Sequence, residues 1–173
     1  NGIIIHNDHL EIKGDILAKT SDGAVLKLQT SDTTVGDGDS IGEIRFSSPN
    51  EASGTDAVQM HAAIVAEADA SFAADNNQTD FVFKLGSSEA ATEKMRLHHE
   101  GNLSLGVNTD VSAEIGRAHI GYVGHSDIAG FSHIDQNATS TYALLQGSNG
   151  STFLNSASGT GIYLRQNNSD VAF

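Results

Sequence analysis

The sequence predicts an all-β protein made of short strands and hairpins, and three observations lead to that prediction. Gly is frequent at 18 residues while Pro occurs once, and clusters of Gly, Asn, Asp and Ser separate short apolar stretches. Several of those stretches alternate apolar and polar residues with the period of two that a half-buried strand requires. Aromatic residues make up only 6% of the 173 residues, so a large self-contained core is not expected.

Strict alternation marks the strands in the middle of the chain. Ile44 and Phe46 share one face of a strand over residues 43–47. A second strand, over residues 81–85, places two Phe and one Leu on the same face. Alternation on both sides of a Glu-Gly-Asn turn predicts a hairpin over residues 93–107.

Residues 56–75 are ambiguous, because an Ala-rich run within them has good helix propensity. A single amphipathic helix is one interpretation. We favour a strand, because apolar residues form an uninterrupted row with a period of two. Small Ala side chains let neighbouring backbones approach closely, so this row suits packing near a crowded axis. The row consists of Met60, Ala62, Ile64, Ala66, Ala68, Ala70 and Phe72.

The composition shifts toward Gly, Ser and Asn after Asn108. Short apolar stretches continue, and turn signals about ten residues apart, at 148–150 and 158–161, separate the last of them. This spacing is typical of β meanders and stacks. The apolar stretches are Ile120 to Val123, Tyr142 to Leu145, Thr152 to Leu154 and Ile162 to Leu164.

These patterns divide the chain into three expected segments. The first is an N-terminal β shaft segment over residues 1–40, and the second is a β module over residues 41–109. The third is a Gly/Ser/Asn-rich β module over residues 110–173. The boundary between the last two falls at 108–113, where the composition changes. The chain begins at Asn1 rather than Met, as expected for a fragment or a processed product.

Charge and composition exclude several classes of function. Nine basic and 22 acidic residues give a net charge of −13, so nucleic-acid phosphates and anionic membrane surfaces would repel the chain. No apolar run approaches the roughly 20 residues of a membrane span, so no membrane insertion is expected. The chain has no Cys, which excludes disulfides, thiolate metal sites and a Cys nucleophile.

Two His-x-Asp pairs are the best metal-ligand candidates. His125 and Asp127 would share one face of an extended strand, as would His133 and Asp135, and a hairpin turn at residues 129–130 would bring the pairs together. The alternative is that these His make hydrogen bonds to Asp or to backbone carbonyls in turns. We favour that alternative and assign no metal, cofactor-binding or catalytic residue.

The other His and acidic groups offer weaker signals. His98 and His99 are adjacent, so in a strand they would point to opposite faces and could not share an ion, and His6 and His9 fail the same test. The acidic residues near Asp37 and over residues 75–80 are expected to form solvated turns and a hairpin loop. No nucleophile elbow or nucleotide loop occurs, so the chain is not expected to be an enzyme.

The middle of the chain resembles the tail-fibre proteins of tailed bacteriophages. Residues 41–46 read IGEIRF and correspond to the IGxIxF strand of that family. Residues 92–97 read TEKMRL and residues 100–107 read EGNLSLGV, which correspond to the family's TERMRI and DGNVGIGT. Lys94 and Leu97 stand where Arg and Ile are commoner. The resemblance covers residues 41–109.

The resemblance implies an elongated, intertwined homotrimeric fibre segment on the virion, which contributes to attachment to a host glycan or protein receptor. Physical reasoning agrees on the need for partners. Short half-buried strands with few aromatics do not bury enough apolar area to offset roughly 1 to 2 kcal/mol of backbone entropy per residue. Other chains can complete the core and pair the strand edges.

The alternative function is a glycan-binding or glycan-cleaving adhesin, since some phage spikes are polysaccharide depolymerases. Aromatic faces stack on sugars, and four aromatics of the last segment are candidates for such a site, although a place in a trimer core is the simpler interpretation of them. They are Tyr122, Phe131, Tyr142 and Tyr163.

Overall fold

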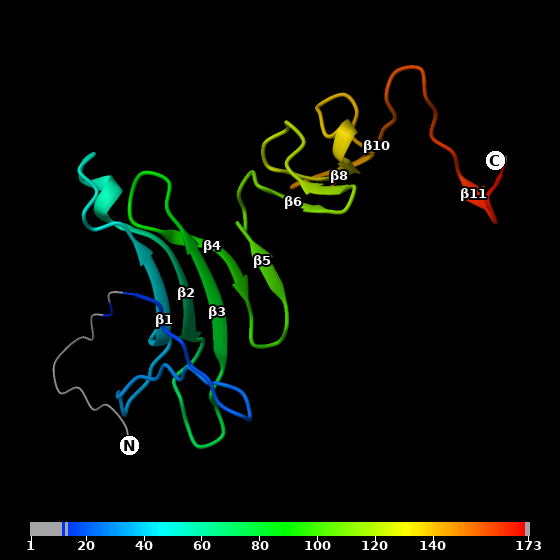
Figure 1. Cartoon of the computed structure of the whole chain (residues 1–173). Coiled ribbons are helices and arrows are strands. Elements are labelled where there is room, and N and C mark those ends of the chain that lie inside the picture. The colour runs from blue at the N-terminus through cyan, green and yellow to red at the C-terminus, as the bar shows by residue number, and fades with distance from the viewer. Residues whose placement is uncertain (1–11, 13, 172–173) are drawn as a thin grey trace.

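The computed structural model, which describes residues 12 and 14–171, is all-β (Figure 1). The described residues contain no α-helix and two 3-10 helices, η1 (Asp56–Val58) and η2 (Ile134–Gln136). The strands form two five-stranded antiparallel sheets and one two-stranded sheet. The all-β prediction is therefore confirmed.

The first sheet is a meander in the order β1-β2-β3-β4-β5. Alternation predicted its strands, of which β2 and β3 bury one face, and the Glu-Gly-Asn turn joins the last two. Gly101 takes a positive φ of 89° in that turn, and its N–H donates to the His98 carbonyl at 2.8 Å. The predicted hairpin is thus confirmed. The strands are β1 (Ser40–Ser47), β2 (Met60–Ala68), β3 (Thr79–Leu85), β4 (Thr92–Leu97) and β5 (Leu103–Leu105).

The ambiguous Ala-rich run is a strand, β2, and not a helix. It is shorter than the period-two row, because the chain turns after Ala68 into the loop before β3. In the middle of the strand the buried residues are the neighbours of the row, Ala63 and Val65, whereas Ile64 is 36% exposed; Ala68, where the row leaves the strand, is buried. The middle of the row therefore lies on the side of the sheet that this chain leaves more exposed.

The second sheet is a smaller meander in the order β10-β9-β8-β7-β6. Apolar stretches predicted β7, β9 and β10, and the turn signal at 148–150 joins β9 to β10, where the Gly150 N–H donates to the Gly147 carbonyl at 2.9 Å. The strands are β6 (Ser112–Ile115), β7 (Ala118–Gly121), β8 (Ile128–His133), β9 (Leu144–Gly147) and β10 (Thr152–Leu154).

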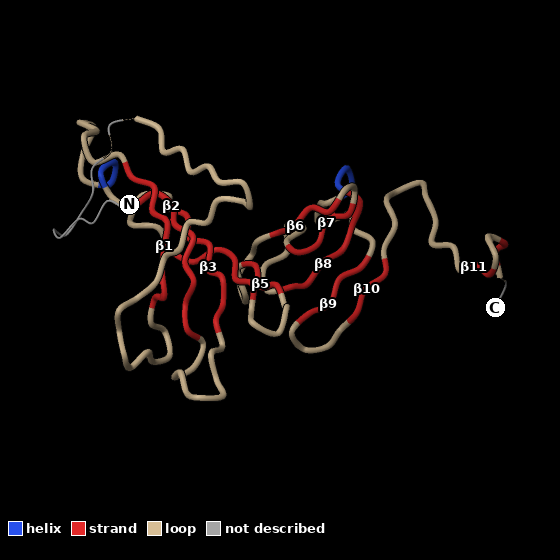
Figure 2. Tube along the Cα trace, turned by 60° about the horizontal axis from the view of Figure 1, so that its bottom comes forward, coloured by secondary structure: helices blue, strands red, loops and turns tan. Residues whose placement is uncertain are grey.

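The apolar stretch from Ile162 to Leu164 forms no strand. These residues belong to the irregular stretch that follows β10, because the structure gives them no partner strand to pair with. The two-residue strands β11 (Arg165–Gln166) and β12 (Ser169–Asp170) pair with each other instead. In both Figure 1 and Figure 2 the three sheets follow one another in chain order.

The structure bears differently on the three expected segments. In the first segment residues 12 and 14–39 hold no strand, and Ser40 begins β1, while residues 1–11 and 13 lie outside the described part of the chain. β5 ends at Leu105 and β6 begins at Ser112. The division into three segments itself stays a prediction.

Candidate functional site

The first sheet has one face that is apolar across all five strands, and we call it the open face. Strand register places its side chains in three rows, because residues paired across antiparallel strands share a face. The first row is Ile44, Ile64, Phe83, Met95 and Leu105; the second is Gly42, Ala66, Phe81, Leu97 and Leu103; the third is Phe46, Ala62, Leu85 and Thr92.

The open face is largely in contact with water in this chain. Phe46 and Phe81 are each 52% exposed, and Leu97 is 41% exposed. Near β1 another segment approaches this face, since a Cβ at Gly42 would lie 2.8 Å from the Leu28 Cβ. Gly42 is therefore required there by close approach, while the large apolar side chains named above remain exposed.

The chain as a whole exposes more surface than a folded monomer of its size. Its accessible surface is 13387 Å², against about 8,100 Å² expected for a compact protein of 18.1 kDa. Among the described residues, seven apolar residues are buried while 27 large apolar side chains are exposed. A core this small cannot account for a stable fold by itself.

The opposite face of the sheet, the closed face, is stabilised by charged groups around Arg96 in β4. The guanidinium donates to Asp80 at 3.0 Å, to Glu67 at 2.7 Å and to Glu93 at 2.7 Å. Hydrogen bonds from Arg96 to Glu93, Glu67 and Asp80 raise the pKa of Arg96 despite the opposing effect of burial. Beside them Val82, paired with Arg96, is fully buried.

Asp80 is the central anion of this network and is itself fully buried. Burial alone would raise the pKa of Asp80, but the hydrogen bonds from Arg96 and from the His99 backbone N–H, at 2.9 Å, outweigh it and lower that pKa below its ordinary 3.8. The loop assigned from sequence to residues 75–80 therefore ends two residues earlier than predicted, since Thr79 and Asp80 lie in β3. The rest of that loop is confirmed, with Gln78 N–H donating to Asn76 Oδ1.

The expectation that His98 and His99 point to opposite faces is wrong. Both rings approach Asp80, with His98 Nδ1 3.2 Å and His99 Nδ1 3.5 Å from its oxygens. The reason is that β4 ends at Leu97, so the two His lie in the turn rather than in the strand. Sequence contained a signal for this network, because the alternation of β3 places Asp80 on the face of Val82.

Asp69, Asp80 and His99 bring three ligand atoms within 4.8 Å of one another. The His99 ring lies between the two carboxylates, with Nδ1 3.2 Å from Asp69 and 3.5 Å from Asp80. The second Asp80 oxygen already accepts from Arg96. A cation placed beside the Arg96 guanidinium would be repelled, so we assign no metal ligand here.

The two His-x-Asp pairs are not brought together. Residues 129–130 lie within β8 and form no turn, so the predicted hairpin is wrong. His125 Nε2 lies 3.1 Å from the Thr139 carbonyl, and His133 Nδ1 accepts from the Asp135 N–H at 3.1 Å. These contacts match the interpretation of His as turn residues. His6 and His9 lie outside the described residues.

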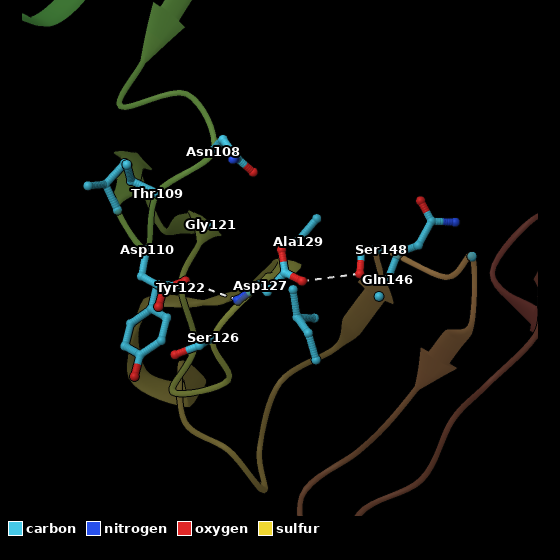
Figure 3. Close-up of a pocket in the computed structure, with 14 residues that line it drawn as sticks. Asn108, Thr109, Asp110, Gly121, Tyr122, Ser126, Asp127, Ala129, Gln146 and Ser148 are labelled. Carbon is cyan, nitrogen blue, oxygen red and sulfur yellow. Dashed lines mark hydrogen bonds between the residues drawn. The ribbon is translucent and has the colours of Figure 1, made fainter.

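A polar groove of about 820 Å³ lies beside the second sheet (Figure 3). Two carboxylates line it and are held in place, since the Asp127 N–H donates to Asp110 at 3.2 Å and Ser148 Oγ donates to Asp127 Oδ2 at 3.1 Å. Asn108 and Asp127 both line it with positive φ angles, of 57° and 59°. Carboxylates, amides and hydroxyls of this kind suit a polyhydroxylated ligand.

The four candidate aromatics do not form one site. Tyr122 lines the groove, whereas Phe131 lies in β8 on an apolar row of the second sheet. Tyr142 packs edge-on against His125 with ring centroids 6.1 Å apart, and the Arg165 guanidinium lies 5.2 Å from the Tyr163 ring centroid. Only Tyr122 therefore remains a candidate for contact with a ligand in the groove.

Comparison with known proteins points to viruses. No model of a known protein family matches the chain. An uncharacterized protein, VP1, of Micromonas pusilla reovirus (isolate Netherlands/2005) is 39% identical over 83 residues, which cover 46% of this chain and 4% of that protein. This similarity suggests a viral protein. In the described residues, no helix is long and apolar enough to cross a membrane.

Proposed function

We propose that this chain is a structural segment of a viral fibre of the bacteriophage tail-fibre type, which works as a homotrimer on the virion and contributes to attachment to a host-surface glycan or protein. The observation that carries the proposal is the open face, because a sheet that is apolar across five strands is stable only when another surface covers it. The excess of accessible surface over that of a compact monomer supports the same conclusion.

Two further observations support the proposal. The resemblance to tail-fibre proteins over residues 41–109 falls on the first sheet, where the open face lies. The similarity to a reovirus protein supports a viral source. With a net charge of −13, the chain is expected to bind neither nucleic acid nor anionic membrane, and we propose no catalytic role for it.

The mass of the protein in solution tests this function. A trimer of the 18.1 kDa chain gives about 54 kDa in sedimentation velocity or mass photometry, and we expect that mass across a tenfold dilution. A stable monomer with full β circular dichroism would contradict the proposal, because the open face would then be stable in water.

A second candidate function is binding or cleavage of a glycan, and the groove with Tyr122, Asp110 and Asp127 favours it. A glycan array on the purified assembly would detect binding, and a polysaccharide viscosity assay would detect cleavage. Tyr122→Ala would abolish a signal from the groove, whereas the control Tyr163→Ala, outside the groove, would leave it unchanged. A signal that survives Tyr122→Ala would contradict a site in the groove.

A further inference from the structure

We infer that the open face of the first sheet is the surface through which copies of this chain pack on one another, with the apolar rows of three sheets turned toward a common axis. The inference rests on the proposed function and deepens it, because it assigns the contact between copies to one face of one sheet. The opposite, closed face would then point away from the axis.

Charge favours a second copy as the occupant. All side chains in the three rows are uncharged, although the chain carries a net charge of −13. Copies with this charge repel one another, so a stable contact between them must leave carboxylates outside the interface. The closed face holds Glu67, Asp80 and Glu93 around Arg96, so the sheet separates its charges from its apolar rows.

Area favours the same occupant. Eight large apolar side chains of the three rows, from all five strands, are between 36% and 59% exposed in the single chain. The side chains of the rows are of the kind that obligate interfaces bury, with Ile44 43% and Leu85 54% exposed in the single chain. A second copy of the chain presents the same apolar face with the same width. The open faces of two copies can therefore cover each other without a further partner.

Packing between copies would explain why small residues occupy the open face in β2. Ala62 and Ala66 in β2 alternate with Ile64, between the strands β1 and β3. Small side chains at the centre of a sheet let a second sheet approach closely, while Phe46 and Phe81 beside them supply apolar area. The row of Ala that was ambiguous in the sequence therefore has a place at the contact between copies.

Lysine substitution on the open face tests the inference. Ile64→Lys places a charge at the centre of the face, at a side chain that is 36% exposed in the single chain. The control Val58→Lys changes an apolar side chain of similar exposure, 39%, in η1 outside the sheet. We expect Ile64→Lys to raise the concentration at which the assembly dissociates at least about a hundredfold, with β circular dichroism retained above that concentration. Val58→Lys and the conservative Ile64→Leu should keep the mass of the wild type.

The outcomes separate the inference from the proposed function. If wild type is an oligomer and Ile64→Lys keeps its mass and midpoint of dissociation, the open face is not the contact and the inference is overturned, while the fibre function stands. If wild type is a monomer at all concentrations, the proposed function fails and the inference fails with it. Leu97→Lys, on a different strand of the same face, provides the second variant should Ile64→Lys not fold, and the same readings apply to it.

Discussion

The two five-stranded sheets have the same strand topology but different polar groups on their buried sides. Each is an antiparallel meander with an apolar face, but the opposite side of the first sheet holds the ion pairs of Arg96, whereas the opposite side of the second holds the buried side chains of His119 and Ser132. In the second sheet His119 is 5% exposed and its Nε2 lies 2.8 Å from the Tyr122 carbonyl. The first sheet should therefore respond to loss of charge and to acid, and the second to changes in backbone geometry.

The largest expected effect is loss of the guanidinium in the first sheet. Arg96→Met leaves Asp80 buried without its cation, which is expected to cost about 3 to 5 kcal/mol in the free energy of unfolding. Urea unfolding followed by circular dichroism measures it. Arg165→Ala removes an ion pair that is half exposed on both sides, so this control should cost at most about 1 kcal/mol. Equal losses in the free energy of unfolding for the two variants would mean that burial does not make the ion pairs of Arg96 stronger than that of Arg165.

The second sheet should be most sensitive at Gly121. This residue has a φ of 124°, and a Cβ there would collide with the Val111 carbonyl oxygen, so Gly121→Ala should cost about 2 kcal/mol or more. Gly116 also has a positive φ, of 62°, but has open space around it, so the matched control Gly116→Ala should cost only about 1 kcal/mol. Thermal unfolding compares them, and a smaller loss for Gly121→Ala would argue against the close approach of β6 and β7.

Acid should weaken the first sheet through Asp80. Because the pKa of Asp80 in the folded chain lies below its ordinary 3.8, its ion pairs contribute fully above that value, and the contribution is lost as the pH falls below 3.8 through the folded pKa. Glu93, whose pKa the Arg96 hydrogen bond also lowers, adds to this loss. Urea midpoints between about pH 5 and 2.5 measure the effect. Asp80→Asn should flatten the profile, and an unchanged slope would rule out Asp80 as its source.

The smallest effects are expected at the His-x-Asp pairs of the second sheet. His125→Ala and His133→Ala each remove one ordinary hydrogen bond, so each should cost no more than about 1 kcal/mol. EDTA should leave the midpoint of unfolding unchanged in wild type and in both variants. A large drop in stability on chelation, together with one or more metal ions per assembly by elemental analysis, would show that these residues hold a metal.

Local sequence patterns predicted the strands, whereas the polar network depends on how the strands pair. Alternation located β1, β3 and β4 because the period of two is visible within each strand by itself. The network of Arg96 depends on which residues face each other across three strands, including a register shift after Phe83, and no single stretch of sequence specifies that. The apolar stretch at 162–164 failed as a strand for a related reason, because a strand also requires a partner.

The open face was visible in the sequence only in part. Each strand showed its apolar side, and the row of Ala in β2 indicated close packing. The sequence did not show that these sides fall on one face of one sheet, because that follows from the antiparallel pairing of β1 to β5. The groove beside the second sheet was not predicted, since loops and strand ends from four parts of the chain line it.

Labelling of single thiols tests most directly whether the open face is buried between copies. The chain has no Cys, so Phe81→Cys and Arg45→Cys each report one position, at side chains that are 52% and 64% exposed in the single chain, on opposite faces of the sheet. If copies cover the open face, the thiol at position 81 should react with maleimide at least about tenfold more slowly than the thiol at position 45 in the native assembly, and equally fast after unfolding. Equal rates in the native protein, with its mass unchanged, would contradict the account.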